Sequence, residues 1–309
     1  QRRFAPGTTD SLYIFTVNRR RDNYASIAGD VESYHENIKG VENQLRYRLT
    51  ESAYFSLNSA LQFKNVQVEN FVEQEVQRRR RRDDVRLSHD LAVAVRSRRF
   101  YSNVILSYWN QEQKYDIEVE QASRPFSSRT AFVTPNNASD RLALQGRFDV
   151  HLSRSDSLYS FFSLSKFQYD TPDTNNFDDR DELRINSTLV YSHFFNPYLR
   201  LKIDAGVNLY HMVYIFGERS ADNNWNRIFR LKPMVTYQPS PRFRLTQTFE
   251  VLANYVDYDF EYENSPTKSF VFRKFSIDDS LKWDVTEKMT LLLDYRLQME
   301  ENGHLSWER

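Results

Sequence analysis

Histidines are the first residues to test for catalysis, because an imidazole can act as a general base or bind a metal ion. The chain has six of them: His35, His89, His151, His193, His211 and His304. His193 has a hydroxyl beside it, on Ser192. Adjacent residues of a strand point to opposite faces of a sheet, so these two cannot form a nucleophile–base pair. The sequence therefore predicts no catalytic residues and no enzyme.

The segment 170–182, DTPDTNNFDDRDE, is dense in carboxylate and amide oxygens, which are ligands that Ca²⁺ prefers. Its spacing does not fit an EF-hand loop, and acidic surface loops are common without a bound metal. The chain has no Cys, which excludes thiolate metal sites and disulfides. We therefore predict no metal and no cofactor, with a cation bound by this segment as the alternative.

Composition excludes several classes of protein. The chain has 309 residues, 27% of them charged and 15% aromatic, with a mean hydropathy of −0.70. The aromatic content argues against a disordered chain, and no apolar run approaches the roughly 20 residues of a membrane helix. Lys+Arg and Asp+Glu both number 42, so there is no excess of positive charge to bind nucleic acid. The chain begins at Gln1, and we expect it to be a processed or trimmed product.

Alternation of apolar and polar residues is the dominant pattern, and it predicts strands. From Leu199 to Leu209 every second residue is apolar, and the residues between them include Arg200, Lys202 and Asp204. The pattern predicts about 14 strands, several of them far longer than the five or six residues typical of globular sheets. The expected ranges are 11–18, 24–36, 43–50, 53–76, 85–96, 100–119, 141–152, 158–169, 183–195, 198–216, 227–238, 242–262, 269–285 and 289–302.

The connections between these strands are alternately short and long. Short turns such as 196–197 and 239–241 follow one strand, and long polar segments such as 121–140 and 217–226 follow the next. The strands of a soluble antiparallel barrel or sandwich also alternate. The length of the strands, the regular change of connection length and the presence of only 7 Gly residues disfavour that alternative.

These patterns resemble a bacterial outer-membrane β-barrel. Hydrocarbon offers no hydrogen-bond partners, so a sheet inside it must close on itself and turn its apolar side chains outward. The resemblance implies an all-β fold, a transmembrane antiparallel up-and-down β-barrel in the bacterial outer membrane, with residues 1–309 as a single domain. Short turns would face the periplasm and long loops the outside. The resemblance is architectural and identifies no specific family.

The expected strand count predicts an incomplete barrel. With short turns in the periplasm, the first expected strand runs inward from the outside, and the last one ends outside near Trp307. Complete bacterial barrels normally start and finish in the periplasm. We therefore expect the chain to be part of a larger barrel of 16 or more strands.

The polar residues of the strands would line the barrel interior. Unpaired buried charge is costly, so a wall with this many charges must be wet or ion-paired. We expect a water-filled lumen whose inner ring favours anions, since charged rings set pore selectivity; a wall neutralised by salt bridges is the alternative. The residues predicted to line the lumen are Arg141, Arg147, Arg200, Lys202, Asp204, Arg230, Lys232, Arg244, Glu250, Asp294 and Arg296.

A run of five arginines caps an expected tall hairpin between 53–76 and 85–96. The residues are Arg78, Arg79, Arg80, Arg81 and Arg82. The pattern predicts an extracellular basic loop that contacts anionic lipopolysaccharide or water, and recognition of a specific anionic ligand is the alternative.

The predicted function is an outer-membrane channel or export conduit for hydrophilic solutes, without covalent chemistry. The alternative is a structural or assembly barrel that houses or docks partner proteins. The expected partners are outer-membrane lipid, lipopolysaccharide and other outer-membrane or periplasmic proteins, and no nucleic acid.

Asp279 departs from the pattern, because it falls among the apolar residues of 269–285. An acidic side chain that faces lipid costs up to a few kcal/mol. Either a bulge at 278–279 resets the alternation, or this face contacts another protein.

Overall fold

The fold is a series of long antiparallel strands. The computed structural model describes residues 7–24, 31–72, 75–120, 136–261 and 268–305. The strands are β1 (Thr8–Tyr24), β2 (Val31–Arg48), β3 (Ala53–Val72), β4 (Glu75–Arg96), β5 (Phe100–Glu120), β6 (Asn137–His151), β7 (Asp156–Asp170), β8 (Arg180–Asn196), β9 (Leu199–Tyr214), β10 (Asn224–Ser240), β11 (Phe243–Tyr258), β12 (Phe270–Thr286) and β13 (Met289–His304). A short 3₁₀-helix, η1 (Gly217–Asp222), lies between β9 and β10.

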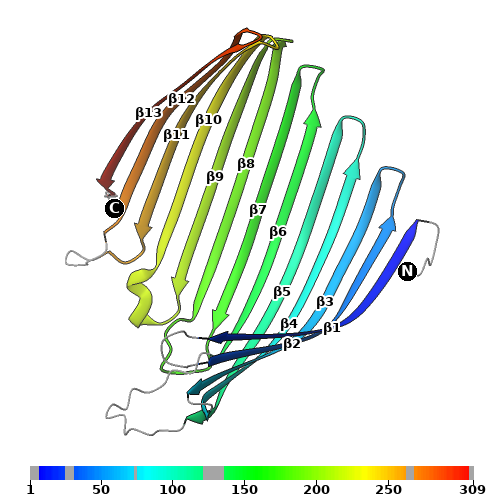
Figure 1. Ribbon diagram of the computed structural model, residues 1–309, viewed down its shortest axis with the longest axis vertical. Helices are drawn as coiled ribbons and strands as arrows, with labels where there is room; N and C mark the ends of the chain where they lie inside the picture. Colours follow the sequence, from blue (N-terminus) through cyan, green and yellow to red (C-terminus); the bar gives the residue numbers. More distant parts are fainter. Residues whose placement is uncertain (1–6, 25–30, 73–74, 121–135, 262–267, 306–309) are drawn as a thin grey trace. The chain divides into compact units, whose positions relative to one another are not determined.

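The topology is up-and-down. Each strand is hydrogen-bonded to its neighbours in sequence, in the order β1 to β13, as Figure 1 shows. Among the described residues, no helix is long and apolar enough to cross a membrane. The all-β, antiparallel up-and-down architecture predicted from the alternation is confirmed.

Contacts divide the chain into two compact units, each of which is described by itself. Unit 1 comprises Gln1–Ala92, Leu106–Leu142 and Phe167–Arg180, and unit 2 comprises Val93–Ile105, Ala143–Lys166 and Asp181–Arg309. The single barrel domain therefore stays a prediction.

The described residues form 13 strands, where the sequence predicts about 14. The expected strands 24–36 and 43–50 are largely parts of one strand, β2. The polar residues between them pair with both neighbouring strands: Asn37 lies opposite Asn18 of β1 and Asn65 of β3. Backbone hydrogen bonds alone form the ladder between two strands, so a strand can include a polar stretch. Hydrogen bonds between the polar side chains of neighbouring strands further stabilise it. Asn43, for example, donates to Asp10 at 2.8 Å.

This correction reverses the direction expected for the first strand. Thr8, at the start of β1, pairs with Tyr47, and Arg48 leads into the short turn between β2 and β3. β1 therefore begins at the short-turn end of the sheet, and the prediction that it runs inward from the long-loop end is wrong. β13 ends at the long-loop end, as expected. Additional strands and closure of the sheet stay predictions.

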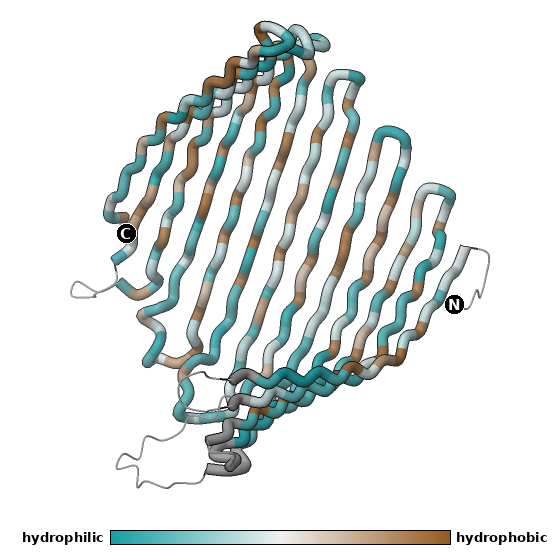
Figure 2. Tube along the Cα trace, in the orientation of Figure 1, coloured by the Kyte–Doolittle hydropathy of each residue, from teal (hydrophilic) through white to brown (hydrophobic). Residues whose placement is uncertain are grey.

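Alternation gives the sheet two chemically distinct faces. In unit 2 we call the side that carries Leu201 and Val207 the apolar face, and the side that carries Lys202 and Asp204 the charged face. Figure 2 shows the result along the strands, where hydrophobic residues are interspersed with hydrophilic ones and form no long continuous run.

The described part of the chain places no protein layer over the apolar face. Large apolar side chains on it are widely exposed, for example Phe229 (42%), Leu231 (46%) and Leu293 (59%). Among the described residues, no large side chain is fully buried. A sheet with an exposed apolar face and no core is unstable in water, so its surroundings must be apolar.

Candidate functional site

The charged face of β9 to β12 carries a group of ion-paired side chains in unit 2. Strand register assembles it, because alternate residues project to one side and antiparallel partners lie opposite each other. Asp204 of β9 lies opposite Lys232 of β10, and Gly206 lies opposite Arg230. Acidic and basic residues on different strands thereby become neighbours.

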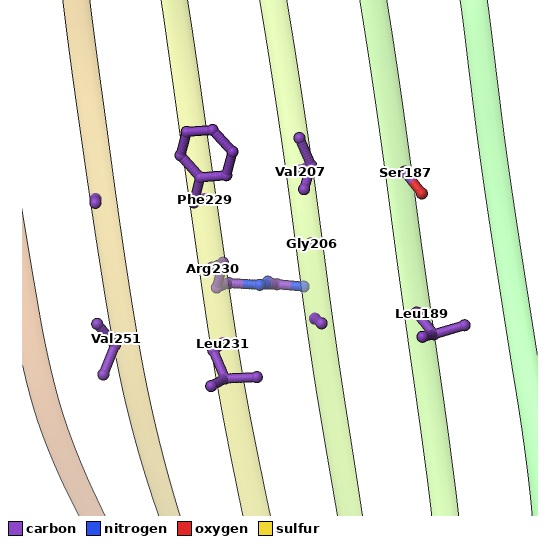
Figure 3. Close-up of a pocket in the computed structure, with 10 residues that line it drawn as sticks. Ser187, Leu189, Gly206, Val207, Phe229, Arg230, Leu231 and Val251 are labelled. Carbon is purple, nitrogen blue, oxygen red and sulfur yellow. The ribbon is translucent and has the colours of Figure 1, made fainter.

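Arg230 reaches sideways along this face to Asp204. Its Nη2 lies 3.0 Å from Asp204 Oδ1, and its guanidinium passes over Gly206, as seen in Figure 3. A Cβ at position 206 would lie 3.7 Å from Arg230 Nε, an ordinary van der Waals contact, so the position of the arginine does not require a glycine here.

Glu250 is shared by two lysines. Its carboxylate lies 2.8 Å from Lys274 Nζ of β12 and 3.7 Å from Lys232 Nζ of β10. The Glu250 side chain is only 14% exposed, whereas Lys232 is 40% exposed. The acid is therefore held at the sheet surface while its partners reach toward water.

Two further predicted lumen residues are also paired. Arg147 Nε lies 2.9 Å from Asp149, and its guanidinium lies over the rings of Tyr101 and Tyr159. Arg296 forms an ion pair with Asp278. These contacts match the alternative in which salt bridges neutralise the wall, so the charged face is partly neutralised.

Other predicted lumen residues have no ion pair within the described part of the chain. They are Arg141, Arg200, Lys202, Arg244 and Asp294. Arg200 instead donates to Ser192 at 3.3 Å and lies over the Phe194 ring. Arg200, Lys202 and Arg244 stand at the starts of β9 and β11, next to short turns, which makes the charged face cationic at that end.

Sequence reasoning missed the partners that complete these pairs. Lys274 and Asp278 stand on the charged face of β12, four and two rungs from Lys282, and the alternation of 269–285 could have identified them. In unit 1, it also missed Glu36, which is 6% exposed and lies 2.5 Å from Lys64 and 3.3 Å from Arg19. The cluster could not be predicted because Glu36 is the last residue of the expected strand 24–36, which has little apolar alternation.

The arginine run does not form a loop. Residues 78–82 lie within β4, so alternation sends neighbouring side chains to opposite faces. Arg79 pairs with Glu69 at 2.7 Å, Arg81 with Asp83 at 3.0 Å and Arg82 with Asp84 at 3.0 Å. The side chain of Arg78 lies outside the described residues. The predicted basic loop is thus a strand whose positive charge is largely paired.

Four of the histidines, His35, His89, His193 and His211, are hydrogen-bonded to neighbouring side chains. His193 Nδ1 lies 2.7 Å from Asp156 on the apolar face, while Ser192 on the charged face accepts from Arg200. The two residues therefore point to opposite sides, as the strand pattern predicts. In the described ranges no three His, Asp or Glu side chains come together as a metal-ligating group. In the acidic segment, Asp179 accepts from the backbone N–H and hydroxyl of Thr171, both at 2.7 Å.

Aromatic residues border the apolar face at both ends. Near the short turns, Phe243 packs edge-on against Tyr237 and Trp283, with ring centroids 6.2 and 6.4 Å apart. Near the long loops, His211 stacks on Trp225 with centroids 4.2 Å apart. Amphipathic rings at both borders of an apolar band are typical of the two membrane interfaces.

The apolar face also contains a hollow between β8 and β11. It has a volume of about 320 Å³, and its lining combines the small residues Ala205 and Ala253 with larger apolar side chains such as Leu189, Phe229 and Leu231. Figure 3 shows the larger side chains on their strands. Ser187 is the polar residue at its edge, besides the stem of Arg230 from the other face. The lining suits a hydrocarbon chain and offers little to a polar ligand.

No protein-family model matches the sequence, and no curated protein matches it. The chain is similar in structure to the ferripyoverdine receptor of the outer membrane of Pseudomonas aeruginosa, with 9% identity and a TM-score of 0.42 over 97% of this chain and 56% of the receptor. It is also similar to an outer membrane channel from Pseudomonas putida F1, with 11% identity and a TM-score of 0.29 over 97% of this chain and 96% of the channel. The chain thus spans little more than half of the receptor's length.

The chain's own strands place it in the outer membrane. A strand needs roughly 9–11 residues to cross a bilayer when tilted, and the apolar residues of β9 extend over the 11 positions from Leu199 to Leu209. The opposite face is charged, and the apolar face is uncovered. Strands with one apolar and one polar face are typical of outer-membrane β-barrels, most of which are bacterial.

Proposed function

We propose that the chain forms the wall of an outer-membrane conduit for hydrophilic solutes, without covalent chemistry. The observation that carries the proposal is that one face of the sheet exposes charged side chains and the other exposes apolar ones. Arg230 and Lys232 on the charged face are 39% and 40% exposed, which requires water beside them, whereas the other face exposes apolar side chains. Ionised groups stay partly exposed only where they are hydrated.

The solutes that such a conduit favours are anions. Arg200, Lys202 and Arg244 are next to the short turns, and none of them has an ion pair in the described ranges. The acids deeper on the same face, such as Asp204 and Glu250, are held by cations. The rest of the wall is charge-balanced, so a ring of cationic side chains at one end attracts anions there and selects them over cations.

A second candidate function follows from the ion pairs themselves. The chain of contacts from Arg230 to Asp204 and from Lys232 through Glu250 to Lys274 also fits a stiff wall around another protein. This is the structural or assembly barrel, which houses or docks outer-membrane or periplasmic proteins. Its lumen would be filled and would not conduct.

Single-channel recording distinguishes the two candidates. The full-length protein is incorporated into planar bilayers in KCl, and discrete conductance steps are the expected result. Absence of steps from protein that folds correctly would overturn the conduit.

Selectivity tests the finer part of the proposal. Under a KCl gradient, replacing Arg200, Lys202 and Arg244 together by Gln is expected to move the reversal potential toward cation preference. Arg273→Gln is the matched control, because Arg273 stands on the apolar face, where it pairs with Glu301 at 3.7 Å. Equal shifts in both variants would contradict a cationic ring.

The partners are the lipids around the wall. The apolar face contacts outer-membrane hydrocarbon, and the arginines of β4 contact anionic lipopolysaccharide headgroups. Arg79, Arg81 and Arg82 are engaged with carboxylates, so their attraction is weaker than that of a free basic loop. Binding that survives 0.5 M salt would instead favour a specific anionic ligand.

A further inference from the structure

A polar rung interrupts the apolar face at β11 to β13. The register places Gln247, Asp279 and Tyr295 side by side on three neighbouring strands. The rungs on either side are apolar and share the same face: Phe249, Ile277 and Leu297 on one side, and Leu245, Leu281 and Leu293 on the other. The polar rung therefore lies inside the apolar band and not at its border.

No bulge removes Asp279 from this face. The pairing of β12 is continuous with both neighbours from Phe270 to Asp284, and its register shifts only between Asp284 and Thr286. The explanation by a bulge at 278–279 is therefore wrong. Contact with another protein is the explanation that remains of the two drawn from the sequence.

Asp279 lacks a hydrogen-bond partner for one oxygen. Its Oδ1 is buried and unbonded among the described residues. Hydrocarbon chains contain no donors, so lipid at this depth cannot satisfy a carboxyl group, which is costly to leave unpaired. Oδ1 has no exposed surface for an outside donor to reach, but the Asp279 residue as a whole is half-buried, so its exposed part can accept a hydrogen bond from a neighbouring protein inside the membrane.

A hollow adjoins the rung. It has a volume of about 280 Å³ and is lined by Leu245, Gln247, Asp279, Leu281, Leu293 and Tyr295. The volume lies just below the range of roughly 300–1,000 Å³ that is usual for small-molecule sites. A side chain from a neighbouring protein suits it better than a free ligand.

A second copy of this chain supplies the matching surface. A two-fold axis along the membrane normal brings each residue to the same depth in both copies, so the polar rung of one copy meets that of the other. The rung is also self-complementary, because the Tyr295 hydroxyl and the Gln247 amide are donors and the Asp279 carboxylate is an acceptor. Two-fold interfaces that use the same patch on both subunits are the commonest in oligomers.

We propose that the apolar face of β11 to β13 is the interface of a homodimer in the membrane, with Tyr295 or Gln247 of one copy donating to Asp279 of the other. The surface around the rung is apolar: Leu245 and Leu297, which stand on the two flanking rungs, are each 38% exposed. The polar rung does not continue onto β10 and β9, where Val235 and Leu201 occupy the same level. The patch that defines the interface is therefore confined to three strands.

Single-cysteine cross-linking in membranes tests the interface, since the native chain has no Cys. Leu293→Cys places a thiol beside the hollow without altering the polar rung. Leu189→Cys is the matched control, because Leu189 is a leucine of β8 on the same face and is 45% exposed. A bis-maleimide is expected to convert at least half of the Leu293→Cys protein to a covalent dimer and to leave Leu189→Cys monomeric.

Asp279→Leu tests the role of the carboxyl group in a Leu293→Cys background, with correct folding checked by resistance to unfolding in detergent. The dimer yield is expected to fall at least fivefold. Equal cross-linking of Leu293→Cys and Leu189→Cys, an unchanged yield with Asp279→Leu, or cross-linking to a different protein would each overturn the proposal. The outcome does not depend on whether the charged face conducts.

Discussion

Lys274 of β12 lies 2.8 Å from Glu250 of β11 and holds it at the centre of the charged face. Glu250 also faces Lys232 at 3.7 Å and is 14% exposed, so one partly buried acid serves two cations. Replacing Glu250 by Gln leaves two ammonium groups without a counter-charge. The expected loss is about 1–3 kcal/mol in the free energy of unfolding, between the values for exposed and buried pairs. The reversal potential should move toward anion preference.

Urea unfolding in lipid vesicles and planar-bilayer recording measure the two effects. Asp294→Asn is the matched control, because Asp294 stands on the charged face of β13, is exposed and has no ion pair among the described residues. Its replacement should change stability by no more than about 0.5 kcal/mol. Equal destabilisation by the two variants would contradict the shared role of Glu250.

Replacing glycine by alanine should have opposite effects on stability at Gly206 and at Gly146. At Gly206 a Cβ would make ordinary contacts with Arg230, of 3.7–3.9 Å, so Gly206→Ala should stabilise the strand by about 0.5–1 kcal/mol. At Gly146 a Cβ would overlap Cε1 of Phe162, whose ring packs on Phe148. Gly146→Ala must displace that ring, and we expect a loss of about 1–3 kcal/mol.

Unfolding in urea ranks the two variants. Gly146→Ala combined with Phe162→Leu separates the clash from an effect on the backbone, since the smaller side chain can move away. A double variant as unstable as the sum of the single variants would show that the ring contact is not the cause.

We predict that the contact between His211 and Trp225 stabilises the long-loop end of the apolar face. Their rings are parallel within 7° with centroids 4.2 Å apart, and His211 Nε2 is hydrogen-bonded to Asp259 at 2.9 Å. His211→Leu removes both contacts and should cost about 0.5–1.5 kcal/mol. Fluorescence of Trp225 should change, and a variant whose spectrum and unfolding midpoint both match the native protein would contradict this role. Trp283, at the other end, should keep its signal.

Strand β9 shows how much of this fold its sequence determines. The alternation from Leu199 to Leu209 predicts the strand, its two faces and the place of Arg200, Lys202 and Asp204, because side chains of a strand alternate with a period of two. The up-and-down order also follows from the short and long connections. Such features are local and need no knowledge of other strands.

The parts that depend on pairing between strands could not be predicted. β2 is poor in apolar alternation and is completed by ladders to β1 and β3, so its sequence suggests two short strands. The arginines 78–82 were expected in a loop because charge runs usually avoid strands, yet Glu69, Asp83 and Asp84 neutralise three of them in β4. The partner of Arg230 was equally invisible, because register decides that it is Asp204.

Glu261 gives the connection between β11 and β12 a dependence on pH. Hydrogen bonds from the Ser269 side chain and backbone N–H, the latter at 2.9 Å, hold the pKa of this exposed carboxyl below its usual value of 4.5, and Lys268 adds to the effect. A pKa that is lower in the folded chain adds stability above pH 4.5, and that stability is lost as the pH falls through the folded value. The connection should therefore loosen only in acid below pH 4.5.

A spin label on Phe260→Cys reports this loosening, because the native chain has no other thiol and Phe260 is 46% exposed. Label mobility should be low at pH 6 and rise as the pH falls below 4.5. Ser269→Ala removes the hydroxyl donor, so the midpoint should move up toward 4.5 and the mobility at pH 6 should increase slightly. A midpoint that stays the same in Ser269→Ala would show that another group controls this end of the sheet.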